Sequence, residues 1–117
     1  MGILKVLFVC ARNLWRSPTA EKIYCKDPRL EVKSAGLHSS AKRVMSLADV
    51  SWADVILVME DKHKKQIQEQ FPNVAPAKIY SLNIPDDYKY MDDDLIKEIE
   101  SATDPILFEI FRKQFED

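Results

Sequence analysis

The sequence predicts an α/β fold: a doubly wound domain with a four-stranded parallel sheet and helices on both faces. Two apolar runs, at residues 3–9 and 55–59, are nearly continuous rather than alternating, which is typical of strands buried on both faces. Amphipathic stretches alternate with the apolar runs, so each strand can be followed by a helix that crosses back to the sheet. The chain has 117 residues, which fits a single domain over residues 1–117.

The remaining elements follow from the same pattern and from turn residues. We expect strands at residues 3–9, 30–35, 55–59 and 77–84, and helices at residues 17–25, 41–47, 61–71, 92–102 and 105–115. Ser17 and Pro18 favour a helix start, because Ser caps helix N-termini and Pro fits the first turn. Asp104 and Pro105 separate the last two helices by the same reasoning. The last helix would pack on the sheet through an apolar face formed by Ile106, Leu107, Ile110 and Phe111.

Composition argues against several classes of function. The net charge is −2 and Lys and Arg form no long run, so we expect neither a nucleic acid nor a membrane surface as partner. Cys10, Cys25, His38 and His63 are too few and too scattered for a zinc site, so we expect no metal and no cofactor. Both histidines are expected in solvated positions. With no secretion signal and no membrane span in the sequence, we expect a cytoplasmic protein with reduced thiols, a monomer by default.

The segment from Cys10 to Arg16 is the leading candidate site, because ligands of doubly wound folds bind where strands end. A short loop entering a helix can direct several backbone N–H groups at one spot, and the helix N-terminus adds about half a positive charge. The planar guanidinium of Arg16 can bind two phosphate oxygens. A thiol in this field is expected to be largely thiolate at neutral pH, which places Cys10 to attack a bound phosphate.

Other residues of the segment support the same interpretation. Ser17 follows Arg16 and can hydrogen-bond the sulfur, which helps the sulfur to leave in a second step. A tight anion-binding loop needs one residue with positive φ, and Asn13 tolerates that conformation in a loop without Gly. We expect the phosphate to be held by Ala11, Arg12, Asn13, Leu14, Trp15 and Arg16. The alternative is that Cys10 is a buried cysteine at a strand end and Arg16 a surface residue.

The segment reads Val-Cys-x-x-Asn-x-x-Arg-Ser-Pro-x-Ala-Glu, which resembles the signature of the low-molecular-weight protein tyrosine phosphatases. Three further motifs are similar to those of the family in the same order, namely Ser34-Ala35-Gly36, residues 53–59 and Asp86-Asp87-Tyr88. The resemblance implies the phosphotyrosine phosphatase I-like fold, with strand order 2-1-3-4, and a metal-independent phosphomonoesterase with a phosphocysteine intermediate. It implies that Cys10 is the nucleophile and that Arg16 is the phosphate clamp. It also implies that Ser17 is the partner of the thiolate and that Asp86 is the general acid.

This chain departs from the family pattern in three places. Fewer than twenty residues separate the Ser-Ala-Gly motif from the third strand, so a wall of the family's substrate groove is missing. The chain therefore resembles a shortened, bacterial-type branch. The second loop cysteine of many family members is absent, with Leu14 and Trp15 in that region, and Cys25 is expected to be a buried apolar residue. Arg12 stands where the family has a small residue, and this extra cation favours acidic substrates.

Dephosphorylation also needs a group that gives a proton to the leaving oxygen and then takes one from water. Asp86 and Asp87 are adjacent, and the spacing alone does not choose between them; the resemblance places the acid directly after Ile-Pro, at Asp86. Trp15 and Tyr88 are candidates for the substrate rim, where an aromatic ring can stack on an aryl phosphate, although either can instead be a packing residue.

The sequence therefore predicts a protein tyrosine phosphatase acting on a phosphorylated protein, with phosphotyrosine as the expected group, or on a small aryl phosphate. The alternative is a non-catalytic phosphate- or phosphopeptide-binding module, which would have no need of Asp86. Arsenate reduction on the same fold is disfavoured, because its relay requires further cysteines and only Cys25 is present.

Overall fold

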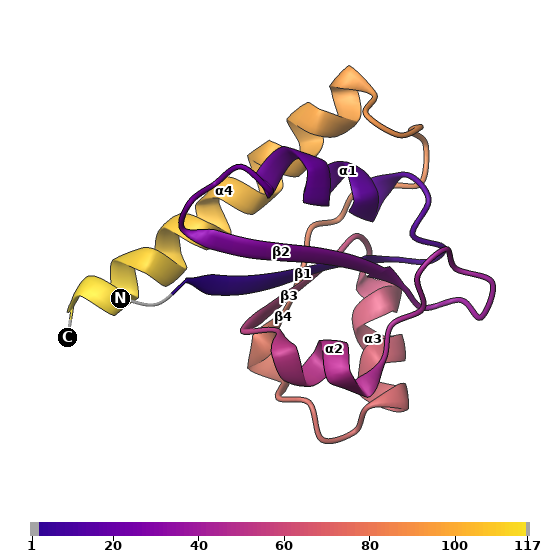
Figure 1. Ribbon diagram of the computed structural model, residues 1–117, viewed down its shortest axis with the longest axis horizontal. Coiled ribbons are helices and arrows are strands. Elements are labelled where there is room, and N and C mark those ends of the chain that lie inside the picture. The colour runs from indigo at the N-terminus through magenta and orange to yellow at the C-terminus, as the bar shows by residue number, and fades with distance from the viewer. Residues whose placement is uncertain (1–2, 117) are drawn as a thin grey trace.

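The computed structural model of the protein describes residues 3–116 and contains the predicted four-stranded parallel sheet. The strands are β1 (Leu4–Cys10), β2 (Leu30–Gly36), β3 (Val55–Val58) and β4 (Ile79–Ser81), in the order β2-β1-β3-β4. The α-helices are α1 (Arg16–Tyr24), α2 (Leu47–Trp52), α3 (Asp61–Gln70) and α4 (Asp93–Glu116), and a 3₁₀ helix, Pro76–Lys78, precedes β4 (Figure 1). The fold class and strand order expected from the sequence are confirmed.

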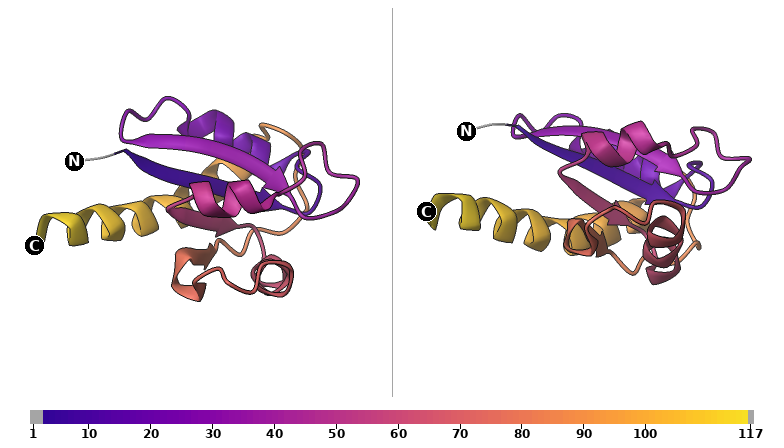
Figure 2. Two further views of the ribbon diagram at one scale, coloured as in Figure 1. Left: turned by 60° about the horizontal axis from the view of Figure 1, so that its bottom comes forward. Right: turned by 90° about the horizontal axis from the view of Figure 1, so that it is seen from below.

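Helices cover both faces of the sheet, with α1 and α4 on one face and α2 and α3 on the other (Figures 1 and 2). Successive residues of β1 therefore face two separate apolar cores. Phe8 packs in the core that includes Ile99 of α4, while Val9 packs in the core that includes Ile67 of α3. This burial on both faces is the physical reason for the continuous apolar runs in the sequence.

The sheet topology brings three connections to one edge. Because all strand pairs are parallel, the carboxyl ends of the strands lie together. β1 ends at Cys10, β3 leads to Glu60, and β4 leads to the loop that carries Asp86. The strand order reverses at β1, which pairs with β2 on one side and β3 on the other, and this is where ligands bind in doubly wound folds.

The prediction of a helix at residues 41–47 is wrong. This segment is irregular, and its backbone pairs with the end of β2: the Gly36 N–H donates to the carbonyl of Arg43 at 2.8 Å. The helix starts later, directly after Ser46. The Ser46 hydroxyl accepts from the Asp49 N–H, and the Asp49 carboxylate accepts from the Ser46 N–H, which is a capping box. The backbone pairing with β2 and the cap at Ser46 explain why the helix begins later in the chain than predicted.

The two helices predicted on either side of Pro105 are one helix, α4. An interior proline removes one intrahelical hydrogen bond and costs about 3 kcal/mol. The helix nevertheless continues, because Ile99 before the proline and Leu107 after it are buried in the same core. β4 is also shorter than the predicted strand at residues 77–84, since residues 76–78 form the 3₁₀ helix.

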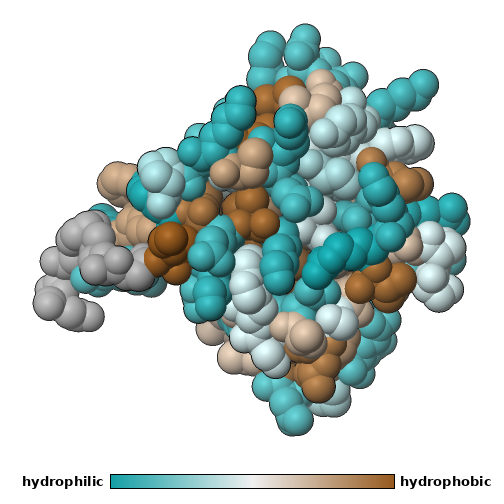
Figure 3. All heavy atoms as spheres, in the orientation of Figure 1, coloured by the Kyte–Doolittle hydropathy of each residue, from teal (hydrophilic) through white to brown (hydrophobic). Residues whose placement is uncertain are grey.

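The surface is mainly polar on the face drawn in Figure 3, where apolar atoms emerge in small separate patches. The C-terminal end of α4 extends past the sheet (Figures 1 and 2), and its Phe108 is exposed. Scattered apolar residues of this kind are normal on a folded protein. Among residues 3–116, no helix combines the length and the apolar character needed to cross a membrane.

Candidate active site

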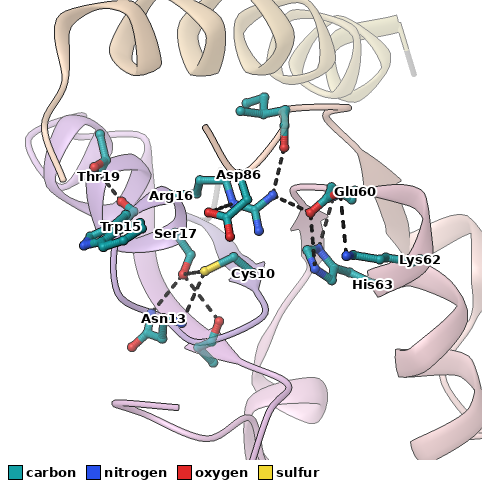
Figure 4. A network of polar contacts seen from close by, with 12 residues as sticks. Cys10, Asn13, Trp15, Arg16, Ser17, Thr19, Glu60, Lys62, His63 and Asp86 are labelled. Atoms are coloured by element: carbon teal, nitrogen blue, oxygen red, sulfur yellow. Dashed lines mark hydrogen bonds and ion pairs between the residues drawn. The ribbon is translucent and has the colours of Figure 1, made fainter. Parts of the chain in front are cut away.

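The loop between β1 and α1 surrounds the thiol of Cys10, the last residue of β1. The Asn13 N–H donates to Cys10 Sγ at 3.3 Å, and the hydroxyl oxygen of Ser17 lies 3.0 Å from the same sulfur (Figure 4). A backbone N–H and a hydroxyl at these distances can both donate to a thiolate. The loop is therefore built to stabilise negative charge on this sulfur.

Asn13 adopts the left-handed conformation that the sequence predicts for it, with a φ of 55°. Its Nδ2 group donates to the hydroxyl oxygens of Ser17 and Ser34, both at 2.9 Å. The Ser34 hydroxyl in turn donates to a carboxylate oxygen of Glu21 at 2.5 Å. This chain of hydrogen bonds joins the loop to β2 and α1 and holds the Ser17 hydroxyl beside the Cys10 sulfur.

Ser17 does not cap α1, contrary to the sequence prediction. The helix begins one residue earlier, at Arg16, and its N-cap residue, Trp15, makes no side-chain cap hydrogen bond. The Ser17 hydroxyl faces Cys10 instead. Within residues 3–116, several loop N–H groups donate to no protein atom, namely those of Ala11, Arg12, Leu14, Trp15 and Arg16. Unsatisfied N–H groups at a helix N-terminus are suited to bind an anion.

Gly36 allows the loop to lie directly on the end of β2. The His38 N–H donates to the carbonyl of Ala11 at 2.8 Å. A Cβ atom at position 36 would lie 2.8 Å from the Ala11 oxygen and 2.9 Å from the carbonyl carbon of Arg12. Both distances are shorter than van der Waals contact, so any other residue here would push the loop away.

The guanidinium of Arg16 is buried, with 3% of the residue exposed, which excludes the alternative of a surface arginine. Its Nη1 donates to Oε2 of Glu60 at 2.6 Å and to the carbonyl of Ile84 at 2.9 Å. Its Nε lies 3.4 Å from Oδ1 of Asp86 (Figure 4). Glu60 follows β3 and Asp86 follows β4, so the ends of three strands converge on the loop. Nη2 has no partner within the described residues and can bind an anion.

The charge of the Arg16 guanidinium changes the pKa of the neighbouring carboxyl group of Glu60. Burial alone would raise the pKa of Glu60, but the hydrogen bond and charge of Arg16 outweigh it and hold that pKa below its usual value. Glu60 is therefore ionised at neutral pH. It acts as a fixed counter-ion that orients Arg16 towards the loop.

His63 is fully buried, and the prediction of a solvated position for it is wrong. Its Nδ1 accepts the Glu60 N–H at 3.1 Å, while Nε2 lies 3.8 Å from Oε2 of Glu60 and has no hydrogen-bond partner within residues 3–116. Burial, and then the charge of Arg16, lower the pKa of His63 to about 4. The imidazole is consequently neutral at neutral pH, and it packs in the first turn of α3 beside the strand ends.

A cavity of about 350 Å³ opens at the loop and is lined by Cys10, Arg12, Leu14, Trp15, Arg16 and Asp86. The cavity thus contains the sequence-predicted nucleophile, clamp and acid together. Asp87 does not line it, and neither does Tyr88, whose half-buried ring packs against the core instead. Of the two predicted rim residues, the structure brings Trp15 to the cavity, with 42% of the residue exposed.

Sequence reasoning misses the residues that support the loop. Glu21 and Ser34 belong to the motifs described above, but their spacing along the chain does not show that they meet beside Asn13. Glu60 carries a usable signal, because it follows a buried parallel strand and must lie at the same edge of the sheet as Cys10. The prediction that Cys25 is buried is wrong: its thiol is exposed at the end of α1.

Several solved structures with this fold are described as phosphatases. The YwlE arginine phosphatase from Geobacillus stearothermophilus is 24% identical, with a TM-score of 0.75, and the match covers 97% of this chain and 96% of that one. Wzb from Vibrio vulnificus, solved in complex with benzylphosphonate, is 24% identical over 92% of this chain and 99% of that one, with a TM-score of 0.76. SP-PTP, a low-molecular-weight protein tyrosine phosphatase from Streptococcus pyogenes, is 20% identical over 92% of this chain and 93% of that one, with a TM-score of 0.75.

No family model matches the chain, and no curated protein sequence matches it either. The chain has the fold of the low-molecular-weight protein tyrosine phosphatases. The resemblance inferred from the sequence motifs is therefore confirmed at the level of the fold.

Proposed function

We propose that the protein is a metal-independent phosphomonoesterase, and specifically a protein tyrosine phosphatase, that works through a phosphocysteine intermediate on Cys10. The observation that carries this proposal is the cavity shared by Cys10, Arg16 and Asp86. The cavity brings together the Cys10 sulfur, which has two hydrogen-bond donors beside it, the buried Arg16 and the exposed carboxyl group of Asp86. Similar solved structures described as tyrosine or arginine phosphatases support the same class of reaction.

In the first step, the thiolate of Cys10 attacks the phosphorus of a monoester bound in the cavity. Arg16 and the free N–H groups of the loop hold the non-bridging oxygens and the negative charge that they carry. The S–P bond forms as the bond from phosphorus to the leaving oxygen breaks, and Asp86 gives its proton to that oxygen.

In the second step, the carboxylate of Asp86 takes a proton from a water molecule as that water attacks the phosphocysteine. The P–S bond breaks, inorganic phosphate forms, and the thiolate of Cys10 is regenerated. The Ser17 hydroxyl and the Asn13 N–H, which already contact the sulfur, donate to it as it leaves. Both donors lower the energy of the departing thiolate.

Asp86 is better placed than Asp87 to be the acid, because Asp86 lines the cavity and contacts the guanidinium of Arg16. A phosphate bound by Arg16 replaces Asp86 as the counter-ion and leaves this carboxyl group free to face the leaving oxygen. The Asp86 side chain is 59% exposed, so this movement disturbs no core contact. A module that only binds phosphate would need the loop and Arg16 but no acid in the cavity, which favours catalysis.

The test is hydrolysis of p-nitrophenyl phosphate in the presence of a metal chelator. We expect turnover by the wild type, none by Cys10→Ser, and a loss of about a hundredfold for Asp86→Ala. The matched control is Asp87→Ala, which should retain most of the activity. Phosphotyrosine and phosphoarginine peptides, compared under the same conditions, identify the substrate class. Turnover that survives Cys10→Ser would disprove the mechanism, and vanadate binding without any turnover would favour the binding module.

A further inference from the structure

A second hollow lies directly beside the catalytic cavity. It has a volume of about 640 Å³ and shares Leu14 and Trp15 with the smaller cavity at Cys10. Leu14 is 46% exposed and Trp15 is 42% exposed, so these two side chains form an apolar wall that both cavities can offer to a ligand. Figure 4 shows Trp15 on the side of α1 that faces away from the Arg16 guanidinium.

The floor of this hollow is one face of α1. Pro18, Lys22 and Cys25 recur at helical spacing and all line it. The opposite walls come from distant parts of the chain, namely Lys42 in the segment after β2 and Tyr90 in the loop before α4. Tyr90 is 48% exposed, so its aromatic side chain is available for a contact with an apolar or aromatic side chain.

The charge of the hollow is complementary to an acidic ligand. Lys22 and Lys42 are exposed and form no ion pair within residues 3–116, and Arg12 at the adjoining cavity is likewise unpaired there. Against these two lysines, the lining of the hollow has one acidic residue, Glu21, whose carboxylate accepts a hydrogen bond from Ser34. The protein as a whole carries a net charge of −2, so this cationic surface is a local feature.

Because the second hollow lies beside the cavity at Cys10, only a substrate that extends beyond its phosphorylated side chain can contact it. Because Leu14 and Trp15 line both cavities, a polypeptide that leaves the smaller cavity along this wall would reach the hollow, whereas a compact aryl phosphate held at Cys10 would not. The hollow shares Leu14 and Trp15 with the cavity of the proposed site, and its lining does not include Cys10, Arg16 or Asp86.

We propose that this hollow is a recognition subsite for the polypeptide next to the phosphorylated residue, with a preference for an aromatic or large apolar side chain accompanied by an acidic one. The proposal rests on the function proposed above and specifies its substrate class. Trp15 and Tyr90 contact the apolar side chain, and Lys22 and Lys42 attract the acidic one. Such contacts add to the binding of a protein substrate and add nothing to that of a small aryl phosphate.

The test compares p-nitrophenyl phosphate with phosphopeptides of the class that the wild type hydrolyses. One peptide has aromatic and acidic flanking residues, and a second has glycine and lysine in their place. We expect Tyr90→Ala to lower kcat/KM for the first peptide about tenfold and to leave p-nitrophenyl phosphate hydrolysis unchanged. The double change Lys22→Glu with Lys42→Glu should abolish the preference for acidic flanks, whereas Lys65→Glu on α3, the matched control, should not.

The outcomes separate the two proposals. Absence of p-nitrophenyl phosphate hydrolysis by the wild type would overturn the function itself. Normal hydrolysis of p-nitrophenyl phosphate together with equal kcat/KM for both peptides, or with no effect of Tyr90→Ala on either peptide, would overturn the subsite alone.

Discussion

The buried imidazole of His63 should make the stability of the protein depend on pH in a defined window. In an unfolded chain the pKa of this group is 6.5, whereas burial and the nearby Arg16 lower it to about 4 in the folded protein. Between these two values the unfolded state binds a proton that the folded state does not. The free energy of unfolding must therefore fall as the pH drops from 6.5 towards 4.

The size of this effect follows from the difference between the two pKa values. One pKa unit corresponds to about 1.4 kcal/mol, so the complete difference corresponds to roughly 3 kcal/mol. Local opening of the first turn of α3, which would let the imidazole bind a proton without global unfolding, reduces this value. We expect a loss of about 1–3 kcal/mol across the window, a large part of the roughly 5–15 kcal/mol that stabilises a typical domain.

The matched variant is His63→Gln, because Gln at this position of a helix can also accept the N–H of the N-cap residue, Glu60. Urea unfolding at a series of pH values should show the loss in the wild type and its absence in the variant. Burial would raise the pKa of Glu60, but Arg16 holds this pKa below 4.5. The contribution of the Glu60 carboxylate to the free energy of unfolding is therefore lost only below pH 4.5. An equal pH dependence for wild type and variant above pH 4.5 would refute this reasoning.

Three further predictions concern the support of the site and the last helix. Glu60→Gln removes the charged partner of Arg16 but keeps a hydrogen-bond acceptor, and we expect kcat/KM for p-nitrophenyl phosphate to fall about tenfold; an unchanged value would show that Glu60 does not orient Arg16. Gly36→Ala should displace the loop and lower kcat/KM about a hundredfold, and wild-type kinetics in this variant would contradict the close packing on β2. Pro105→Ala restores an intrahelical hydrogen bond and should raise the free energy of unfolding by about 1–3 kcal/mol in urea titrations; a destabilised variant would mean that the proline fits α4 without cost.

Patterns within short stretches of the sequence were sufficient to predict the buried strands and the loop after β1. The continuous apolar runs identified the buried strands, because a strand covered on both faces has no polar side. The loop after β1 was recognisable from Cys10 and Arg16, and the positive φ of Asn13 followed from a steric limit that applies to one residue at a time. Each of these features depends on neighbours in the chain, which is why the sequence alone suffices for them.

Tertiary structure decided the features that depend on residues far apart in the chain. Residues 41–47 pair with the end of β2 instead of forming a helix, and α4 continues through Pro105 because one core covers both of its halves. Glu60 and His63 lie near the loop that follows Cys10 because β3, which precedes them, pairs with β1. Parallel strands bring their carboxyl ends to one edge from distant positions in the chain, so the partners that meet there are set by the packing of the sheet and its helices.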